Sequence, residues 1–175
     1  ALAVRHTEEE REAVLEITRG VYVETGYEGA NVGALLTSKG ALLVDTPMLP
    51  PEARAWKWTL QQMGVPEPYY GIVNTDYHPE HVLGNAVFMP TRIWGHELAA
   101  KQLAKYKSSL LEQLANAYRE ENPSLADELM QVEVYLPEVC VGDKVTLHMD
   151  DRPVEIIYLN GHTPFSSVVA FLAYY

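Results

Sequence analysis

Cysteine is almost absent from this sequence: Cys140 is the only one among 175 residues. An intrachain disulfide is therefore excluded. Both neighbours of Cys140 are valines, so we expect it to be a small, buried apolar side chain. The sequence also has no run of about twenty apolar residues, and it predicts no membrane-spanning helix. It has no signal-peptide pattern, but a removed signal would leave no trace. A cytoplasmic location is favoured slightly over a mature exported chain.

Basic residues are scarce. Lysine and arginine total 13 against 24 acidic residues, which gives a net charge of −11. Such a balance disfavours non-specific binding to nucleic acid or to an anionic membrane surface, so neither is an expected partner. With 47% hydrophobic and 21% charged residues, the composition is that of a globular protein. The length fits one domain over residues 1–175, without a linker.

Four potential metal ligands are crowded into a six-residue segment. Asp76, His78, Glu80 and His81 follow the apolar run Tyr69–Val73, which resembles a buried strand that ends in a loop. In an extended segment, side chains two residues apart project to the same side. Imidazole and carboxylate together suit zinc, iron or manganese better than calcium. The alternative is a polar loop whose histidines are unrelated.

A second histidine follows another strand-like segment. The apolar run Val154–Leu159 leads into Asn160–Pro164, a turn in which Gly161 permits unusual backbone angles beside His162. Two strand ends of this kind could face one metal pocket.

The two segments together resemble the signature of the metallo-β-lactamase superfamily. That signature reads Thr-His-x-His-x-Asp-His, followed later by a Gly-His-Thr or Gly-His-Ser turn. Thr75–His81 matches the first part, Gly161–Thr163 matches the second, and Leu42–Thr46 is similar to an opening strand of the family. The resemblance covers nearly the whole chain. It implies an α/β fold, the metallo-β-lactamase-like αββα sandwich, incomplete in this chain.

The resemblance also implies a set of site residues. Five would be metal ligands: Asp76, His78, Glu80, His81 and His162. Asp45 would lie below the metal and hold a ligand by a hydrogen bond, whereas a turn or cap role is the alternative for it. The implied cofactor is one or two zinc ions, with iron or manganese as alternatives.

The match departs from the family pattern at three places. Asp76 stands where the family has its first histidine, and Glu80 stands where it has aspartate. Asp76→His is therefore expected to raise zinc affinity. The family pattern also continues to a bridging aspartate and a last histidine, which would lie beyond Tyr175. Activity is expected to be weak as a result.

Two functions follow from these features. The resemblance implies a hydrolase in which a metal-bound hydroxide attacks an ester, thioester, lactam, sulfate or phosphodiester bond of a small-molecule substrate. Glu80 would be its catalytic residue, because it would orient the hydroxide or take its proton. The alternative is a non-catalytic binding or structural module with a degenerate metal site, completed by another chain. The apolar segment 167–175 is expected to be covered in either case, by a second copy or by a C-terminal segment.

Hydrophobic periodicity predicts the elements around these loops. Helices are expected at Pro50–Met63, Glu97–Tyr118 and 122–131. Strands are expected at 14–25, 31–37, 41–45, 86–89, 92–94, 132–136, 139–141, 144–149, 153–159 and 167–174. His96, at a junction between strand and helix, is expected to start the helix or lie on the surface, and His6 and His148 are expected to be structural or exposed.

Overall fold

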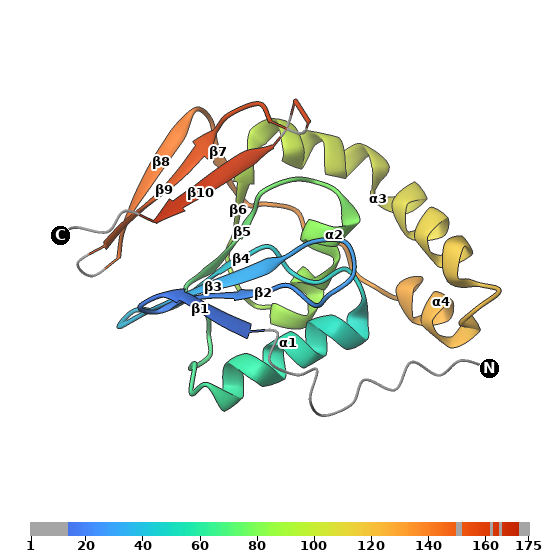
Figure 1. Ribbon diagram of the computed structural model, residues 1–175. Helices are drawn as coiled ribbons and strands as arrows, with labels where there is room; N and C mark the ends of the chain where they lie inside the picture. Colours follow the sequence, from blue (N-terminus) through green and yellow to red (C-terminus); the bar gives the residue numbers. More distant parts are fainter. Residues whose placement is uncertain (1–13, 150–151, 162, 165, 172–175) are drawn as a thin grey trace.

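The computed structural model describes residues 14–149, 152–161, 163–164 and 166–171. Seven strands form a mixed sheet in sequence order (Figure 1). They are β1 (Val14–Thr18), β2 (Val21–Glu24), β3 (Val32–Thr37), β4 (Gly40–Val44), β5 (Gly71–Asn74), β6 (Ile93–His96) and β7 (Val139–Val141). Pairing is antiparallel from β1 to β4 and parallel from β4 to β7.

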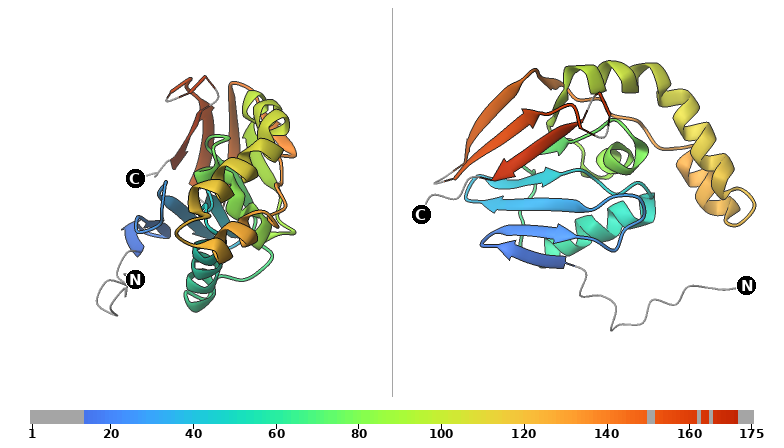
Figure 2. Two further views of the ribbon diagram at one scale, coloured as in Figure 1. Left: turned by 90° about the vertical axis from the view of Figure 1, so that its right-hand side faces the viewer. Right: turned by 45° about the horizontal axis from the view of Figure 1, so that its top comes forward.

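A second, antiparallel sheet of three strands lies against the first. Its order is β10–β9–β8, from β8 (Lys144–Met149), β9 (Arg152–Tyr158) and β10 (Ser167–Phe171). Leu35, Leu42 and Val73 of the large sheet form one buried cluster with Val154 and Ile156 of the small sheet. The two sheets therefore bury a common core between them (Figures 1 and 2).

The opposite face of the large sheet is covered by helix α1 (Pro50–Gln62). Neighbouring strand residues point to opposite faces, so Leu43 and Ile72 meet Trp56 and Leu60 of α1 rather than the small sheet. Trp56 and Leu60 are both fully buried, which stabilises the fold by about 1.5–3 kcal/mol for each side chain. Pro50 starts the helix as predicted.

Two further helices extend to one side of the sheets. They are α3 (Glu97–Tyr118) and α4 (Pro123–Leu129). Buried residues of both helices belong to one cluster with Val82 of the short helix α2 (Pro79–Val82) and with Leu83. Asn122 caps α4 by accepting a hydrogen bond from the Leu125 amide. No described helix is long and apolar enough to cross a membrane. Helix, sheet and sheet are three layers of the predicted αββα sandwich, so the fold class is confirmed.

The parallel strands place the candidate site. Val44 of β4 pairs beside Val73 of β5, so both strands end at one edge of the sheet. Asp45 and Thr75 follow these two ends, 30 residues apart in sequence. The prediction that strands deliver the site residues into loops is confirmed here.

Two strand predictions in the first half of the chain are wrong. Residues 14–25 form a hairpin of β1 and β2, because Gly20 takes a left-handed φ of 75° that permits a tight turn. Residues 86–89 fall largely within the 3-10 helix η2 (Leu83–Phe88). The strand expected to pair with them, at 92–94, lies largely in β6. Both edges of β6 are already paired, one with β5 and the other with β7. Leu83 and Phe88 of η2 are buried in the core instead.

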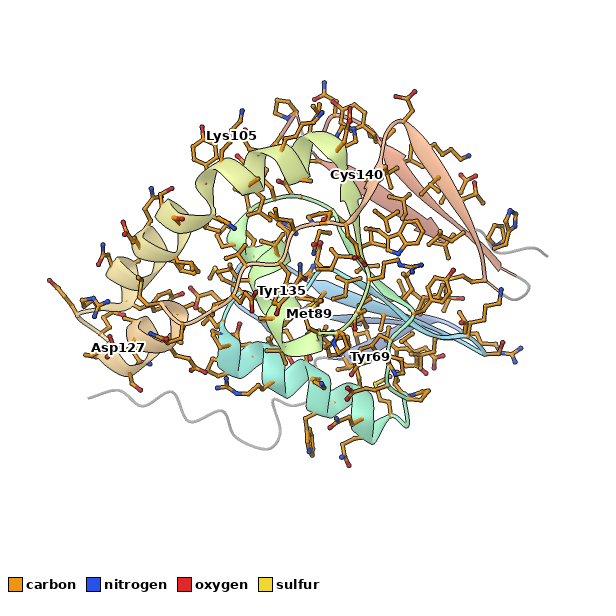
Figure 3. All side chains as sticks on the ribbon, turned by 180° about the vertical axis from the view of Figure 1, so that it is seen from behind. Tyr69, Met89, Lys105, Asp127, Tyr135 and Cys140 are labelled. Atoms are coloured by element: carbon orange, nitrogen blue, oxygen red, sulfur yellow. The ribbon has the colours of Figure 1, made fainter. Side chains whose placement is uncertain are left out.

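Two predictions for the segment between α4 and β8 are also wrong. Residues 132–136 are not a strand, since their alternating apolar side chains pack on the cluster beneath α3 and α4 instead of pairing. Cys140 is exposed rather than buried. It lies on β7, the edge strand of the large sheet (Figure 3), where alternation turns Val141 into the core and Cys140 outward.

Candidate functional site

Asp45 connects the ends of β4 and β5. Its carboxylate accepts hydrogen bonds from the Thr75 amide at 2.7 Å and from the Thr75 hydroxyl at 2.6 Å. Its backbone adopts φ 57°, a left-handed conformation that aspartate and asparagine tolerate better than most residues. The side chain is buried. Asp45 is thus held in one orientation below the loop that carries the signature residues.

The same carboxylate contacts His81 on helix α2. Oδ2 of Asp45 lies 2.9 Å from Nδ1 of His81. Burial lowers the pKa of His81, but the hydrogen bond and negative charge of Asp45 outweigh it, so the pKa is raised. With Nδ1 engaged by the carboxylate, Nε2 is the nitrogen with which His81 could bind a metal. A carboxylate behind a histidine is the usual arrangement for metal-binding imidazoles in proteins.

A buried polar network fixes the backbone of His81. The carbonyl oxygen of His81 accepts hydrogen bonds from Asn74 Nδ2 at 2.7 Å and from the Thr46 amide at 3.2 Å. Asn85 bridges both donors, because its Oδ1 accepts from Thr46 Oγ1 at 2.9 Å and its Nδ2 donates to Asn74 Oδ1 at 2.8 Å. Satisfied buried networks of this kind are rigid. The position of His81 is therefore fixed at both its ring and its backbone.

Gly84 allows this network to close. A Cβ built on Gly84 would lie 2.9 Å from the Cβ of Thr46 and closer still to the carbonyl oxygen of Pro47. Only glycine permits such an approach of the loop after β4 to the segment after α2. The roles of Thr46, Asn74 and Asn85 have no signal in the sequence, because nothing there separates buried polar residues from exposed ones.

Asp76 is the most buried of the four predicted ligands that the structure describes, with 3% of its surface exposed. One oxygen, Oδ1, accepts from the Tyr77 amide at 2.6 Å and lies 3.2 Å from Nδ1 of His78. The other, Oδ2, accepts from Thr163 Oγ1 at 3.0 Å and Ser166 Oγ at 2.7 Å. Burial raises the pKa of Asp76, but these hydrogen bonds outweigh it and the pKa is lowered.

Through these contacts the two predicted segments meet. Thr163 and Ser166 belong to the turn after β9, and they are about 90 residues away from Asp76 in sequence. His162, the predicted ligand in this turn, lies outside the described residues. Its neighbour Thr163 nevertheless places the turn beside the signature loop.

His78 and Glu80 are both partly exposed. His78 precedes α2, its side chain is 31% exposed, and its ring stacks on Tyr77 with 4.4 Å between ring centroids. Glu80 lies in the first turn of α2. The loop between β2 and β3 reaches it, since a Cβ on Gly29 would lie only 2.6 Å from Cβ of Glu80.

The loop over Glu80 is held from two sides. The Glu28 amide donates to Glu52 Oε2 of α1 at 3.2 Å, and the carboxylate of Glu28 accepts from the hydroxyl of Tyr118 at the end of α3. Burial, followed by the hydrogen bond to Glu28, raises the pKa of Tyr118, which keeps its hydroxyl a donor.

The two buried carboxylates of the site have different contacts. Asp45 orients the ring of His81, which leaves Nε2 of that ring for a metal. Asp76 already accepts hydrogen bonds from three donors of its own chain. Within the described ranges, no group of three or more His, Cys, Asp or Glu side chains is placed to hold a metal ion. His162 lies outside those ranges.

His96 has the structural role that was expected for it. It caps α3, where its Nδ1 accepts a hydrogen bond from the Leu98 amide at 3.2 Å. Its ring stacks on Tyr158 with 4.0 Å between ring centroids. His148 is exposed, also as expected, while His6 lies outside the described residues.

Comparison with protein-family models gives no match, and comparison with curated proteins gives none either. Solved structures do match. A metallo-β-lactamase of Cronobacter sakazakii with a HARLDQ motif has a TM-score of 0.67 and 19% identity, over 91% of this chain and 57% of that one. A subclass B3 metallo-β-lactamase of Bradyrhizobium japonicum has a TM-score of 0.65 and 20% identity, over 93% and 57%.

An enzyme of another specificity matches equally well. The stereoselective inverting sec-alkylsulfatase of a Pseudomonas species has a TM-score of 0.65 and 16% identity, over 90% of this chain and 29% of that one. This chain thus spans rather more than half of the matched lactamases and less than a third of the sulfatase. At these identities the likeness concerns the fold alone. The chain has the metallo-β-lactamase fold, over a part of the length that the matched proteins have.

Proposed function

We propose that this chain is the site-bearing part of a metal-dependent hydrolase. The observation that carries the proposal is the 2.9 Å contact between Asp45 Oδ2 and His81 Nδ1. A buried carboxylate that engages one imidazole nitrogen orients the ring and leaves the other nitrogen for a metal. The buried amides and hydroxyls behind His81 give that ring a fixed place.

In this proposal His78, Glu80, His81 and His162 are the residues that would hold the metal. A bound divalent ion would act as a Lewis acid, which lowers the pKa of water and polarises the bond to be broken. Glu80 would accept the proton of the attacking water, as a partly exposed carboxylate in the first turn of α2. Asp45 would keep His81 oriented through its Nδ1. Zinc is the first choice, with iron and manganese as alternatives.

The proposed substrates are small molecules with a bond that a metal-bound hydroxide can hydrolyse. The matched proteins are described as lactamases and an alkylsulfatase, so lactam and sulfate ester bonds head a panel that also includes ester, thioester and phosphodiester bonds. Substrate choice resides in loops outside the signature. The loop between β2 and β3, which lies against Glu80, would be one of them.

The second candidate is a non-catalytic module that keeps the fold. It is supported by the lack of a group of three metal ligands within the described residues, and by aspartate in place of the family's first histidine. A second copy, or another segment that covers 167–175, would complete such a module.

Hydrolysis of the panel by the purified protein separates the two. Each substrate is assayed after dialysis against a chelator, and again after addition of zinc, manganese or ferrous iron. The hydrolase proposal predicts activity that is lost on chelation and restored by one of the metals. His81→Ala should abolish it, while His148→Ala, at an exposed position of β8, should leave it unchanged. Lack of metal-dependent hydrolysis of every substrate would favour the module.

A further inference from the structure

The hydrogen bonds of Asp76 differ from those expected of a metal ligand whose oxygens are free to bind an ion. A carboxylate has two oxygens and about four lone-pair sites. Here Oδ1 faces the Tyr77 amide and Nδ1 of His78, and Oδ2 faces the hydroxyls of Thr163 and Ser166. All four contacts lie at 3.2 Å or less, and the side chain is 4% exposed. The carboxylate is thus already surrounded by groups of its own chain.

The two hydroxyls are themselves organised. Ser166 Oγ lies 3.0 Å from Thr163 Oγ1 and accepts from the Thr163 amide at 3.0 Å. The turn after β9 is therefore closed on itself and presents both hydroxyls to one oxygen of Asp76. Since a buried carboxylate without donors is costly, Asp76 and this pair of hydroxyls depend on each other.

We propose that Asp76 is a positioning residue, which fastens the turn after β9 to the signature loop and is not a metal ligand. The inference rests on the proposed function, because it decides which residues of that site are left to hold the metal. It reverses the role that the family signature implies for this position. Aspartate, where the family has a histidine ligand, would then provide hydrogen bonds between the signature loop and the turn after β9.

This role explains why histidine cannot replace Asp76. A neutral imidazole has only one acceptor nitrogen. Asp76 offers two acceptor atoms, because Oδ1 accepts from the Tyr77 amide and Oδ2 accepts from the Thr163 and Ser166 hydroxyls. Asparagine is a better substitute, because it keeps one carbonyl oxygen and its NH2 group can donate to a hydroxyl that rotates. The predicted order of replacement is therefore opposite to that of a metal ligand, for which histidine is good and asparagine poor.

A double-mutant cycle in metal-free protein tests the fastening itself. Asp76→Ala, Ser166→Ala and the double variant are unfolded with urea in the presence of a chelator. Each single variant should be less stable, and the double variant should lose less than the sum. The expected coupling is about tenfold in the unfolding equilibrium constant, as for a hydrogen bond to a charged group. Ser109→Ala, whose hydroxyl bonds to Tyr106 on α3, is the control and should add to Asp76→Ala. Additive effects for Ser166→Ala would overturn the inference.

Zinc titration of two Asp76 variants supplies a second readout. A positioning role predicts that Asp76→Asn binds zinc with nearly the affinity of the unmodified protein, while Asp76→His binds it about tenfold more weakly or more so. Tighter binding by Asp76→His, with weak binding by Asp76→Asn, would establish Asp76 as a ligand and overturn the inference. If the unmodified protein binds no zinc, the proposed function fails, and the metal-free cycle alone decides the role of Asp76.

Discussion

The carboxylate of Asp45 lies 2.9 Å from the ring of His81, although the two residues are 36 positions apart in sequence. One follows strand β4 and the other lies on helix α2, and the parallel pairing of β4 with β5 brings them together. Because Asp45 also binds Thr75, a single buried side chain orients both the start of the signature loop and its last histidine.

Asp45→Asn is predicted to weaken zinc binding by about 10–100-fold, the usual cost of losing the partner behind a metal-binding histidine. Asparagine tolerates the left-handed backbone at this position, so the change tests the carboxylate rather than the turn. Zinc titration measures the effect. Asp127→Asn on α4, where the side chain is 75% exposed (Figure 3), is the control. Equal affinity in all three proteins would remove Asp45 from the metal site.

Gly84→Ala is predicted to destabilise the protein by about 3 kcal/mol, at the upper end for overpacked sites. The added methyl would meet backbone at Pro47 and the side chain of Thr46, so neither neighbour can yield cheaply. Gly142→Ala is the matched change, since a Cβ there meets nothing within 4 Å. Urea unfolding of both variants gives the comparison, and an equal loss at the two glycines would contradict the close approach.

Trp56→Ala is predicted to cost about 3–5 kcal/mol of unfolding free energy, because the ring is fully buried between α1 and the large sheet. Trp58, on the same helix, is 55% exposed, and Trp58→Ala should cost less than about 1 kcal/mol. Thermal unfolding distinguishes them. Similar losses would contradict the orientation of α1 that buries Trp56 and exposes Trp58.

His96 is predicted to make stability depend on pH. Burial lowers the pKa of His96, although Glu97 and Asp143 oppose the change. The unfolded chain therefore binds a proton more readily, starting near the ordinary histidine pKa of 6.5. Stability from this residue is fully present above pH 6.5 and is lost as the pH falls from there toward the lowered value. Protonation of Nδ1 would also remove the N-cap of α3, because Nδ1 must accept the hydrogen bond from the Leu98 amide.

His96→Asn keeps a capping side chain but has no proton to gain. Urea unfolding between pH 8 and pH 5 should show a smaller loss of stability in this variant than in the unmodified protein. A loss of the same size in both would show that His96 does not carry the pH dependence.

The sequence predicted the elements that depend on local pattern. The helix that starts at Pro50 and the long helix over Glu97–Tyr118 were found from apolar residues at three- and four-residue steps, and both ranges are close to those of the structure. The hairpin of β3 and β4 was found from its apolar runs around Lys39 and Gly40. These features are decided within ten to twenty residues, so a single sequence contains them.

Other features depend on contacts that the sequence does not contain. The buried acceptors and donors of Asn74 and Asn85 are polar residues in a core, and only the fold pairs them. The apolar alternation at 132–136 is satisfied by helices instead of strands. The signature named Asp76 as a ligand by position, whereas its partners in the turn after β9 were identifiable only once both loops were in place.

The most direct test of the proposed metal site is a zinc titration of chelator-treated protein, made on the unmodified chain, His81→Ala and His148→Ala. His81 would be a ligand itself, so its loss should weaken binding by at least about a hundredfold, more than the loss of its carboxylate partner. His148→Ala should bind as the unmodified chain does. Equal zinc affinity in the three proteins, or no zinc binding by any of them, would contradict the account.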